Sequence, residues 1–151
     1  QGWLMPHHHE RQVLPFSAEQ MYDLVIDIRR DAEFLPWVAA VRVRSENDDE
    51  MLADLVVGFK ALRETFSSRV LKTPKSKVVV DYLDGPMRHL HNQWLFEEMP
   101  GGCVVDFTVD FAFHNRIFEA LAGQYFNTAL RKMTDAFIER AEVLYGDGNK
   151  S

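Results

Sequence analysis

The spacing of apolar residues changes twice along the chain. Apolar residues recur at helical spacing after Ser17, alternate with polar residues from Val38 to Phe113, and return to helical spacing from about Arg116 to Tyr145. Alternation is typical of strands, whereas recurrence every three to four residues is typical of helices. The sequence therefore predicts an α+β chain with strands in the middle and a long helix at the end.

The segment before the strands predicts two helices. Ser17 and Gln20 have the spacing of a capping box, so a first helix is expected from there to about Ile28. Asp31 is expected to cap a short second helix. Pro36 must end that helix, because proline disfavours helical geometry in the residue before it.

The middle of the chain predicts six strands joined mostly by hairpins. Four turn signals interrupt the alternation, and a fifth turn is needed near Phe59 to Ala61. A short strand around Arg11 to Leu14 brings the sheet to about seven strands. The four turn signals are Asn47-Asp48-Asp49, Thr73-Pro74, Asp84-Gly85-Pro86 and Pro100-Gly101-Gly102.

Each predicted strand has one apolar and one polar face. In the sixth strand of the chain, Leu90, Trp94 and Phe96 alternate with His89 and His91. Such alternation is typical of an antiparallel sheet that is covered on one side. The apolar stripe of the last helix would supply the cover.

Two histidines raise the question of a metal site. His89 and His91 share one strand face, so they are close enough to reach a common ion. The same face also carries Gln93 and Glu97, which favours a solvated surface. The sequence also lacks the zinc-hydrolase, phosphate-loop, dinucleotide-binding and nucleophile-elbow motifs, so it predicts no metal and no catalytic residue of those kinds.

Asn92 and Glu64 fall on the apolar faces of their strands. Burying an amide or a carboxylate without a partner costs several kcal/mol, so both need hydrogen bonds or a cavity. One interpretation is a structural hydrogen bond. The other is a polar contact inside a mostly apolar ligand pocket. The pattern leaves both open.

The segment from Phe34 to Val38 also has two interpretations. It is either a core plug between helix and sheet or an apolar lip over a pocket, and an exposed lip would suit membrane or partner contact.

Composition narrows the functional classes. The 151 residues are 46% hydrophobic and include eleven phenylalanines, more aromatic surface than a small core usually needs, which suggests a roomy apolar interior. The net charge of −6 disfavours broad nucleic-acid binding, and no DNA partner is expected. The lone Cys103 forms no internal disulfide, and no apolar run approaches the length of a membrane span. We expect one domain over residues 6–146, with flexible ends at 1–5 and 147–151.

Several segments resemble the coenzyme Q-binding protein family of the START-like (polyketide cyclase/dehydrase) superfamily, which includes bacterial ribosome-association toxins. The resemblance covers nearly the whole chain. Two departures border the expected entrance: Met87 stands where the family commonly has an aromatic, and Asp31-Ala32 where it has Tyr-Pro. The matching segments are YDLVIDI at 22–28, FLPWV at 34–38, VGFKALRETFSSRV at 57–70, GPMRHLHNQWLF at 85–96 and MTDAFIERAEVLYG at 133–146.

The resemblance implies a helix-grip fold with a hydrophobic cavity between the sheet and the last helix. The expected ligand is a polyprenyl quinone such as ubiquinone, bound without catalysis and without an obligatory cofactor. The expected location is the bacterial cytoplasm, with peripheral contact at the inner membrane face. The predicted ligand-binding residues are Phe34, Leu35, Pro36, Trp37, Phe59, Glu64, Phe66, Asn92, Trp94, Phe107, Phe111, Phe126, Leu130, Met133 and Phe137.

Two other functions stay open. One is a ribosome-binding regulator that blocks subunit association, for which Arg42, Arg44, Arg63 and Arg69 would form a basic patch on the outer face of the sheet. The other is a polyketide cyclase or aromatase, for which Glu64 is the candidate acid or base.

Overall fold

The computed structural model describes residues 7–59, 62–114 and 116–146. Residues 1–5 and 147–151, expected to be flexible, and most of the turn expected at Phe59 to Ala61 lie outside the described residues. The elements are β1 (His7–Leu14), α1 (Ala18–Ile26), the 3-10 helix η1 (Ile28–Glu33), β2 (Val38–Glu46), β3 (Glu50–Phe59), β4 (Leu62–Thr73), β5 (Lys77–Asp84), β6 (Met87–Met99), β7 (Gly102–Phe113) and α2 (Arg116–Tyr145).

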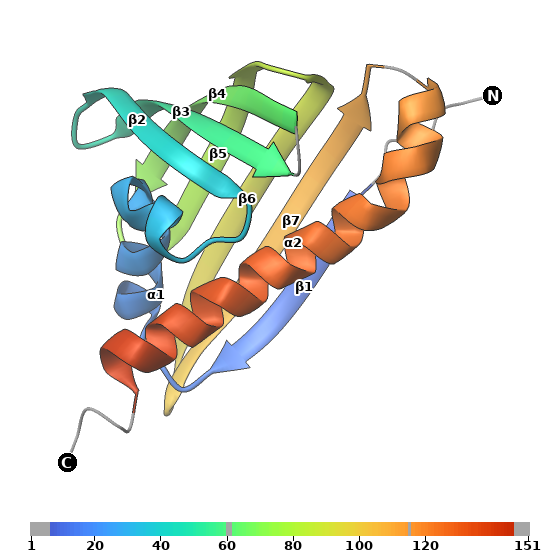
Figure 1. The fold of residues 1–151 in the computed structure, drawn as a ribbon. Helices are drawn as coiled ribbons and strands as arrows, with labels where there is room; N and C mark the ends of the chain where they lie inside the picture. Colours follow the sequence, from blue (N-terminus) through green and yellow to red (C-terminus); the bar gives the residue numbers. More distant parts are fainter. Residues whose placement is uncertain (1–6, 60–61, 115, 147–151) are drawn as a thin grey trace.

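The seven strands form one antiparallel sheet in the order β1-β7-β6-β5-β4-β3-β2. Strands β2 to β7 follow one another as hairpins, and β1 adds to the edge beside β7. Helix α1 and η1 carry the chain from β1 to β2 at the opposite edge, and α2 runs diagonally across the concave face (Figure 1). The predicted helix-grip arrangement is confirmed.

The first strand begins earlier than the predicted Arg11. His7 already pairs with Asp110 of β7, and the ladder continues to Leu14 opposite Cys103. His8 and Glu10 are the inward, buried residues of this part of the strand. Because these two inward positions are polar, the segment lacks the apolar alternation that is typical of the other strands.

The capping box at Ser17 is confirmed: its hydroxyl accepts from the Gln20 backbone N–H, and the Gln20 side chain accepts from the Ser17 N–H. Helix α1 ends at Ile26, slightly before the predicted end. The prediction that Asp31 caps the second helix is wrong, because Asp31 lies inside η1 and Asp27 holds the capping position.

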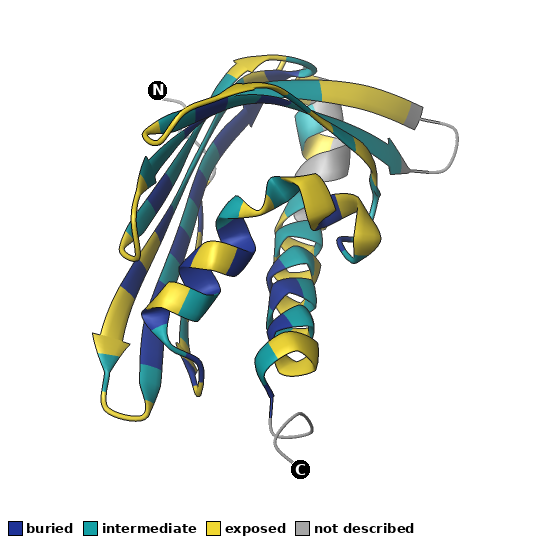
Figure 2. Cartoon of the chain, turned by 90° about the vertical axis from the view of Figure 1, so that its left-hand side faces the viewer, coloured by how far each residue is buried: buried dark blue, intermediate teal, exposed yellow. Residues whose placement is uncertain are grey.

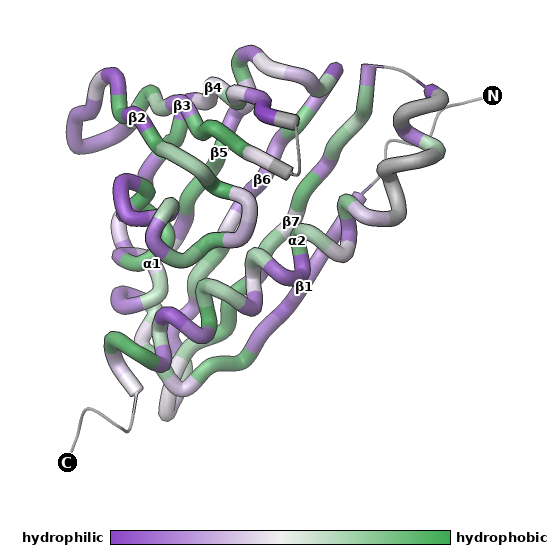
Figure 3. Tube along the Cα trace, in the orientation of Figure 1, coloured by the Kyte–Doolittle hydropathy of each residue, from purple (hydrophilic) through white to green (hydrophobic). Residues whose placement is uncertain are grey.

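The core lies between the sheet and the helices. Phe107, Val109 and Phe111 of β7 are almost fully buried beneath α2, which contributes Phe137 and Ala141. Buried and exposed positions alternate along α1 and α2 (Figure 2). Hydrophilic residues collect instead in the β2–β3 loop, at the far edge of the sheet (Figure 3).

Candidate functional site

A cavity of about 280 Å³ lies between the concave face of the sheet and α2. Its walls come from α1, η1, the segment after η1, strands β2 to β7 and the middle of α2. Apart from Asp31, Ser68 and Asn92, every lining residue is aliphatic, aromatic, methionine or proline. A concave, mostly apolar space with a few polar groups is the usual form of a small-molecule site.

Most of the predicted ligand-binding residues line this cavity. Their position matches the prediction, while their role in binding stays a prediction. The predicted residues that line the cavity are Leu35, Pro36, Trp37, Phe66, Asn92, Trp94, Phe107, Phe126, Leu130, Met133 and Phe137. The prediction omitted further lining residues, namely Val25, Ile28, Asp31, Val38, Ala53, Leu55, Val57, Ser68, Val70, Val78, Val80, Leu90, Val109 and Ala129.

Glu64 lies on the inner face of β4, as strand parity predicts, but not at the cavity. It is exposed and does not line the cavity, although its register partner Val57 does. Its exposure shows that the inner face of the sheet is open to solvent at this position. Strand parity identifies the face of the sheet on which a residue lies, but not how far the helices cover that face.

Two predicted aromatic residues lie just behind the cavity wall. The Phe34 ring packs edge-on against Phe137, 5.3 Å between centroids, and the Arg140 guanidinium lies 5.0 Å from its centroid. Phe111 is buried against Phe126, with centroids 4.3 Å apart. Both residues therefore support lining residues and do not face the ligand space. The side chain of Phe59 lies outside the described part of the structure.

The inward direction of Asn92 agrees with strand parity. It sits on β6 between Val80 of β5 and Val109 of β7, and all three line the cavity. Its side-chain Oδ1 is buried and has no hydrogen-bond partner among the described residues. A structural hydrogen bond to this oxygen, one of the two interpretations of Asn92, is therefore not what the structure shows.

The neighbouring histidines point to the other face. His91 Nδ1 lies 2.8 Å from Asp81 Oδ1 on the outer surface of the sheet, and both side chains are more than one-third exposed. Over the described ranges, no group of three or more His, Cys, Asp or Glu side chains could hold a metal ion.

Asp31 is a cavity residue that the sequence did not reveal. Only 6% of it is exposed, and its Oδ1 has no hydrogen-bond partner among the described residues. Burial, with a smaller contribution from the charge of Asp27, raises the pKa of Asp31 to about 8. Its carboxyl group is therefore mostly neutral near pH 7.

A signal for Asp31 does exist in the sequence. Ile28, Asp31 and Leu35 are spaced as residues on one face of a helix, and all three line the cavity. An acid between two apolar residues on a single helical face could have been recognised as inward. The expectation of a helix cap concealed it.

Aromatic rings form one wall of the cavity. Trp94 packs on Phe107 at 4.2 Å between centroids and edge-on against Phe137 at 5.3 Å. Trp37 lies on another side, in the left-handed region with φ of 67°, and its carbonyl accepts a 2.7 Å hydrogen bond from the Gly58 N–H. Of the Phe34 to Val38 segment, Leu35 to Val38 line the cavity, and Leu35 is also buried in the core, so the segment has features of both interpretations.

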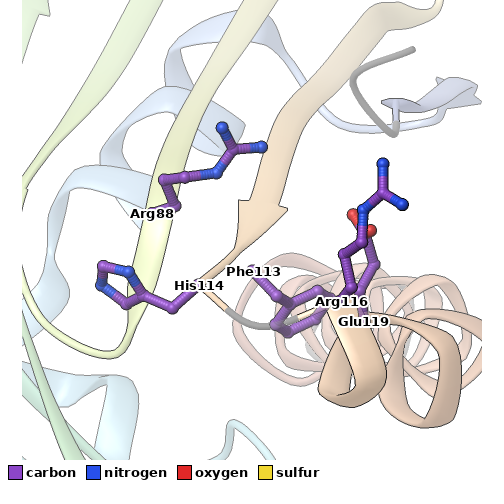
Figure 4. A pocket seen from close by; sticks show the side chains of 5 residues that line it. All are labelled: Arg88, Phe113, His114, Arg116 and Glu119. Carbon is purple, nitrogen blue, oxygen red and sulfur yellow. The ribbon is translucent and has the colours of Figure 1, made fainter. Parts of the chain in front are cut away.

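A second pocket, of about 230 Å³, lies where β6 begins, β7 ends and α2 starts. Figure 4 shows Arg88 and His114 on one side, and Arg116 and Glu119, one helical turn apart, on the other. Phe113 supplies its apolar surface. Most residues that line this second pocket are charged or polar, whereas those of the first cavity are mostly apolar. The first cavity therefore remains the candidate site for a lipophilic ligand.

Two of the four arginines expected to form a basic patch on the outer face of the sheet, Arg44 and Arg69, have acidic partners. Arg44 Nη2 lies 3.2 Å from Asp54 Oδ1, and Arg69 Nε lies 3.2 Å from Glu50 Oε2. Arg42 is the register partner of the same Asp54. Neighbouring acidic side chains thus offset the positive charges of Arg44 and Arg69.

No helix within the described ranges combines the length and apolar composition needed to span a bilayer.

Residues 14–138 match the family model described as polyketide cyclase/dehydrase and lipid transport. A protein named ribosome association toxin RatA from Rickettsia prowazekii is 36% identical over 135 residues, which are 87% of this chain and 92% of that protein. The mitochondrial coenzyme Q-binding protein COQ10 of Drosophila melanogaster is 32% identical over 86% of this chain and 56% of its own length.

Among solved structures, the Zhui aromatase/cyclase from Streptomyces superposes with a TM-score of 0.78 over 92% of this chain and 94% of its own. Its sequence identity is 16%, so this likeness concerns the fold. The sequence matches, the sheet order and the apolar cavity agree with one another. The chain therefore belongs to the polyketide cyclase/dehydrase and lipid transport family of START-like proteins, together with relatives named as ribosome association toxins and coenzyme Q-binding proteins.

Proposed function

We propose that this protein binds a polyprenyl quinone, or a closely similar lipophilic aromatic molecule, in the cavity beneath α2, without catalysing a reaction on it. The observation that carries the proposal is the cavity of about 280 Å³, whose lining is apolar except for Asp31, Ser68 and Asn92. Transfer of apolar ligand surface out of water, at roughly 25 cal/mol per Å², would supply most of the affinity.

The size and chemistry of the cavity suit the head group of such a ligand. The volume is near the lower end of the range for small-molecule pockets, so it holds a substituted ring and only the first part of a long tail. Trp94 and Phe107 offer ring faces for aromatic contact. The name of the Drosophila relative, a coenzyme Q-binding protein, supports the same ligand class. We place the exchange of this ligand at a membrane surface, in support of respiration or quinone biosynthesis.

The test is extraction of the protein purified from its own host, followed by mass spectrometry for quinones, and a thermal-shift titration with a short-chain quinone. A binding ligand raises the melting temperature as its concentration exceeds Kd. An empty protein in extraction, together with no thermal shift, would remove the proposal.

A pair of variants on α2 sharpens this test. Ala129 lines the cavity, whereas Ala120 on the same helix is exposed. Ala129→Phe should fill the ligand space and abolish the thermal shift, while Ala120→Phe should leave it unchanged. Equal shifts in both variants would show that the ligand binds elsewhere.

A second candidate function is binding to ribosomal subunits, which the name of the Rickettsia relative favours. The paired arginines of the outer face and the net charge of −6 give little electrostatic support for RNA contact. Co-sedimentation with isolated subunits at low salt tests this function. The cyclase alternative loses Glu64 as its acid, and the cavity lining offers Asp31 with no Lys, Arg or His beside it for proton transfer.

A further inference from the structure

We infer that the cavity binds its aromatic ligand preferentially in a hydroxylated form, a hydroquinone or phenol, because the Asn92 oxygen needs a hydrogen-bond donor that an oxidised quinone does not have. This inference rests on the proposed function and adds the redox form of the ligand to it.

The first step of the argument is the state of Asn92. Its Oδ1 is buried, and no described residue donates to it. Its neighbours across the strands, Val80 and Val109, are aliphatic and also line the cavity. A buried acceptor of this kind costs about 1–3 kcal/mol unless a donor reaches it. Since Val80 and Val109 have no donor to offer, a molecule bound in the cavity is well placed to supply one.

The second step compares the two redox forms. The ring oxygens of a quinone, and any ether oxygens on the ring, are acceptors only. Each ring hydroxyl of a hydroquinone or phenol donates one hydrogen bond and also accepts. A quinone oxygen facing Asn92 Oδ1 would leave two acceptors opposed, whereas a hydroxyl would satisfy the amide oxygen. With Oδ1 as the amide atom that lacks a partner, Asn92 therefore favours the hydroxylated form, whereas its Nδ2 group would donate to a quinone oxygen only if the amide turned over.

Asp31 contributes in a different way. It enters the cavity from η1, and its Oδ1 also has no partner among the described residues. With its pKa raised to about 8 by burial and by Asp27, the carboxyl is mostly neutral near pH 7. A neutral carboxyl both donates and accepts. It can therefore pair with a quinone carbonyl or with a hydroxyl, and it stabilises both redox forms.

The test measures the affinity of the full chain for a decyl-substituted benzoquinone and for its hydroquinone, the latter under anaerobic conditions. One net hydrogen bond corresponds to a preference of about tenfold for the hydroquinone. Such a preference also raises the reduction potential of the bound two-electron couple by about 30 mV, which gives an independent readout.

Three variants separate the contributions. Asn92→Leu should abolish the preference by weakening hydroquinone binding. Asp31→Leu should weaken both forms and keep their ratio. Val80→Ala, at the register partner of Asn92, should also weaken both forms equally, because it removes apolar contact that they share.

The outcomes are distinguishable. Equal affinity for the two forms in the wild-type chain, or tighter binding of the quinone, overturns this inference and leaves the proposed function standing. A preference that persists in a folded Asn92→Leu variant overturns the role of Asn92. If neither form binds, the proposed function fails and the inference fails with it. The wild-type comparison needs no variant, so it stands even where a substitution prevents folding.

Discussion

The hydroxyl of Thr134 on α2 lies within hydrogen-bond distance of two acceptors, Glu10 Oε2 on β1 at 3.2 Å and the Leu130 carbonyl of its own helix at 3.1 Å. The same carboxylate oxygen lies 2.5 Å from Nε2 of His8, and all three residues are buried. The last helix is thus hydrogen-bonded to the first strand of the sheet, at a position between the cavity and the sheet edge.

Thr134→Val should destabilise the fold by about 1–2 kcal/mol, because it leaves a buried Glu10 with one partner fewer while the side-chain shape is kept. Chemical denaturation gives the free energy of unfolding. Thr128→Val is the matched control, since Thr128 is exposed on the same helix and should change stability by less than about 0.5 kcal/mol. Equal effects of the two substitutions would contradict a structural role for the Thr134 bond.

Asp31 should make stability depend on pH. Its pKa is near 8 in the folded chain and about 4 in the unfolded chain. Between these values the folded state binds more protons, so the free energy of unfolding falls as pH rises, by about 1.4 kcal/mol per pH unit, and levels off above about pH 8. Asp31→Asn removes this contribution. The free energy of unfolding of the variant should therefore increase relative to that of the wild type as the pH rises between these two pKa values.

Denaturation of both proteins at several pH values checks this prediction. Asp48→Asn, in the exposed β2–β3 loop, makes the same chemical change and should show no such growth. A constant difference between Asp31→Asn and wild type from about pH 5 to about pH 8 would mean that Asp31 is charged throughout.

Trp37 holds a left-handed backbone, with φ of 67°. A Cβ atom is unfavourable there by about 1 kcal/mol, a cost that glycine does not have. Trp37→Gly should therefore be more stable than Trp37→Ala by about that amount in thermal or chemical denaturation, although both lose the indole. At the exposed Ala39 of β2, the Ala-to-Gly change should be destabilising instead. The same sign at both positions would argue against backbone strain at Trp37.

Tyr82 closes the turn between β5 and β6. Its hydroxyl accepts from the Met87 N–H at 2.7 Å and donates to the Met87 carbonyl at 2.9 Å. Tyr82→Phe removes both bonds and should lower the free energy of unfolding by about 1–3 kcal/mol. Tyr125→Phe serves as the control, because Tyr125 is 74% exposed. A Tyr82→Phe variant as stable as the control would show that water replaces the hydroxyl.

The order of the elements could be predicted because it depends on local rules. Alternation along β6 placed Asn92 inward and His91 outward, and the capping box at Ser17 marked the start of α1. Each of these features depends on neighbours within a few residues of the chain, so a single sequence contains the information.

The tertiary structure alone decided what covers each face. Glu64 has inward parity but is exposed, Asp31 on η1 is buried and lines the cavity, and β1 pairs with β7 from His7 onward. Burial and pairing of this kind depend on residues far apart in the chain, and they set the free energy of each polar group. The sequence by itself determined that one apolar face of the sheet, with Asn92 on it, is turned toward the last helix. The packing of η1 and α2 decided that Asp31, not Glu64, lines the cavity together with Asn92.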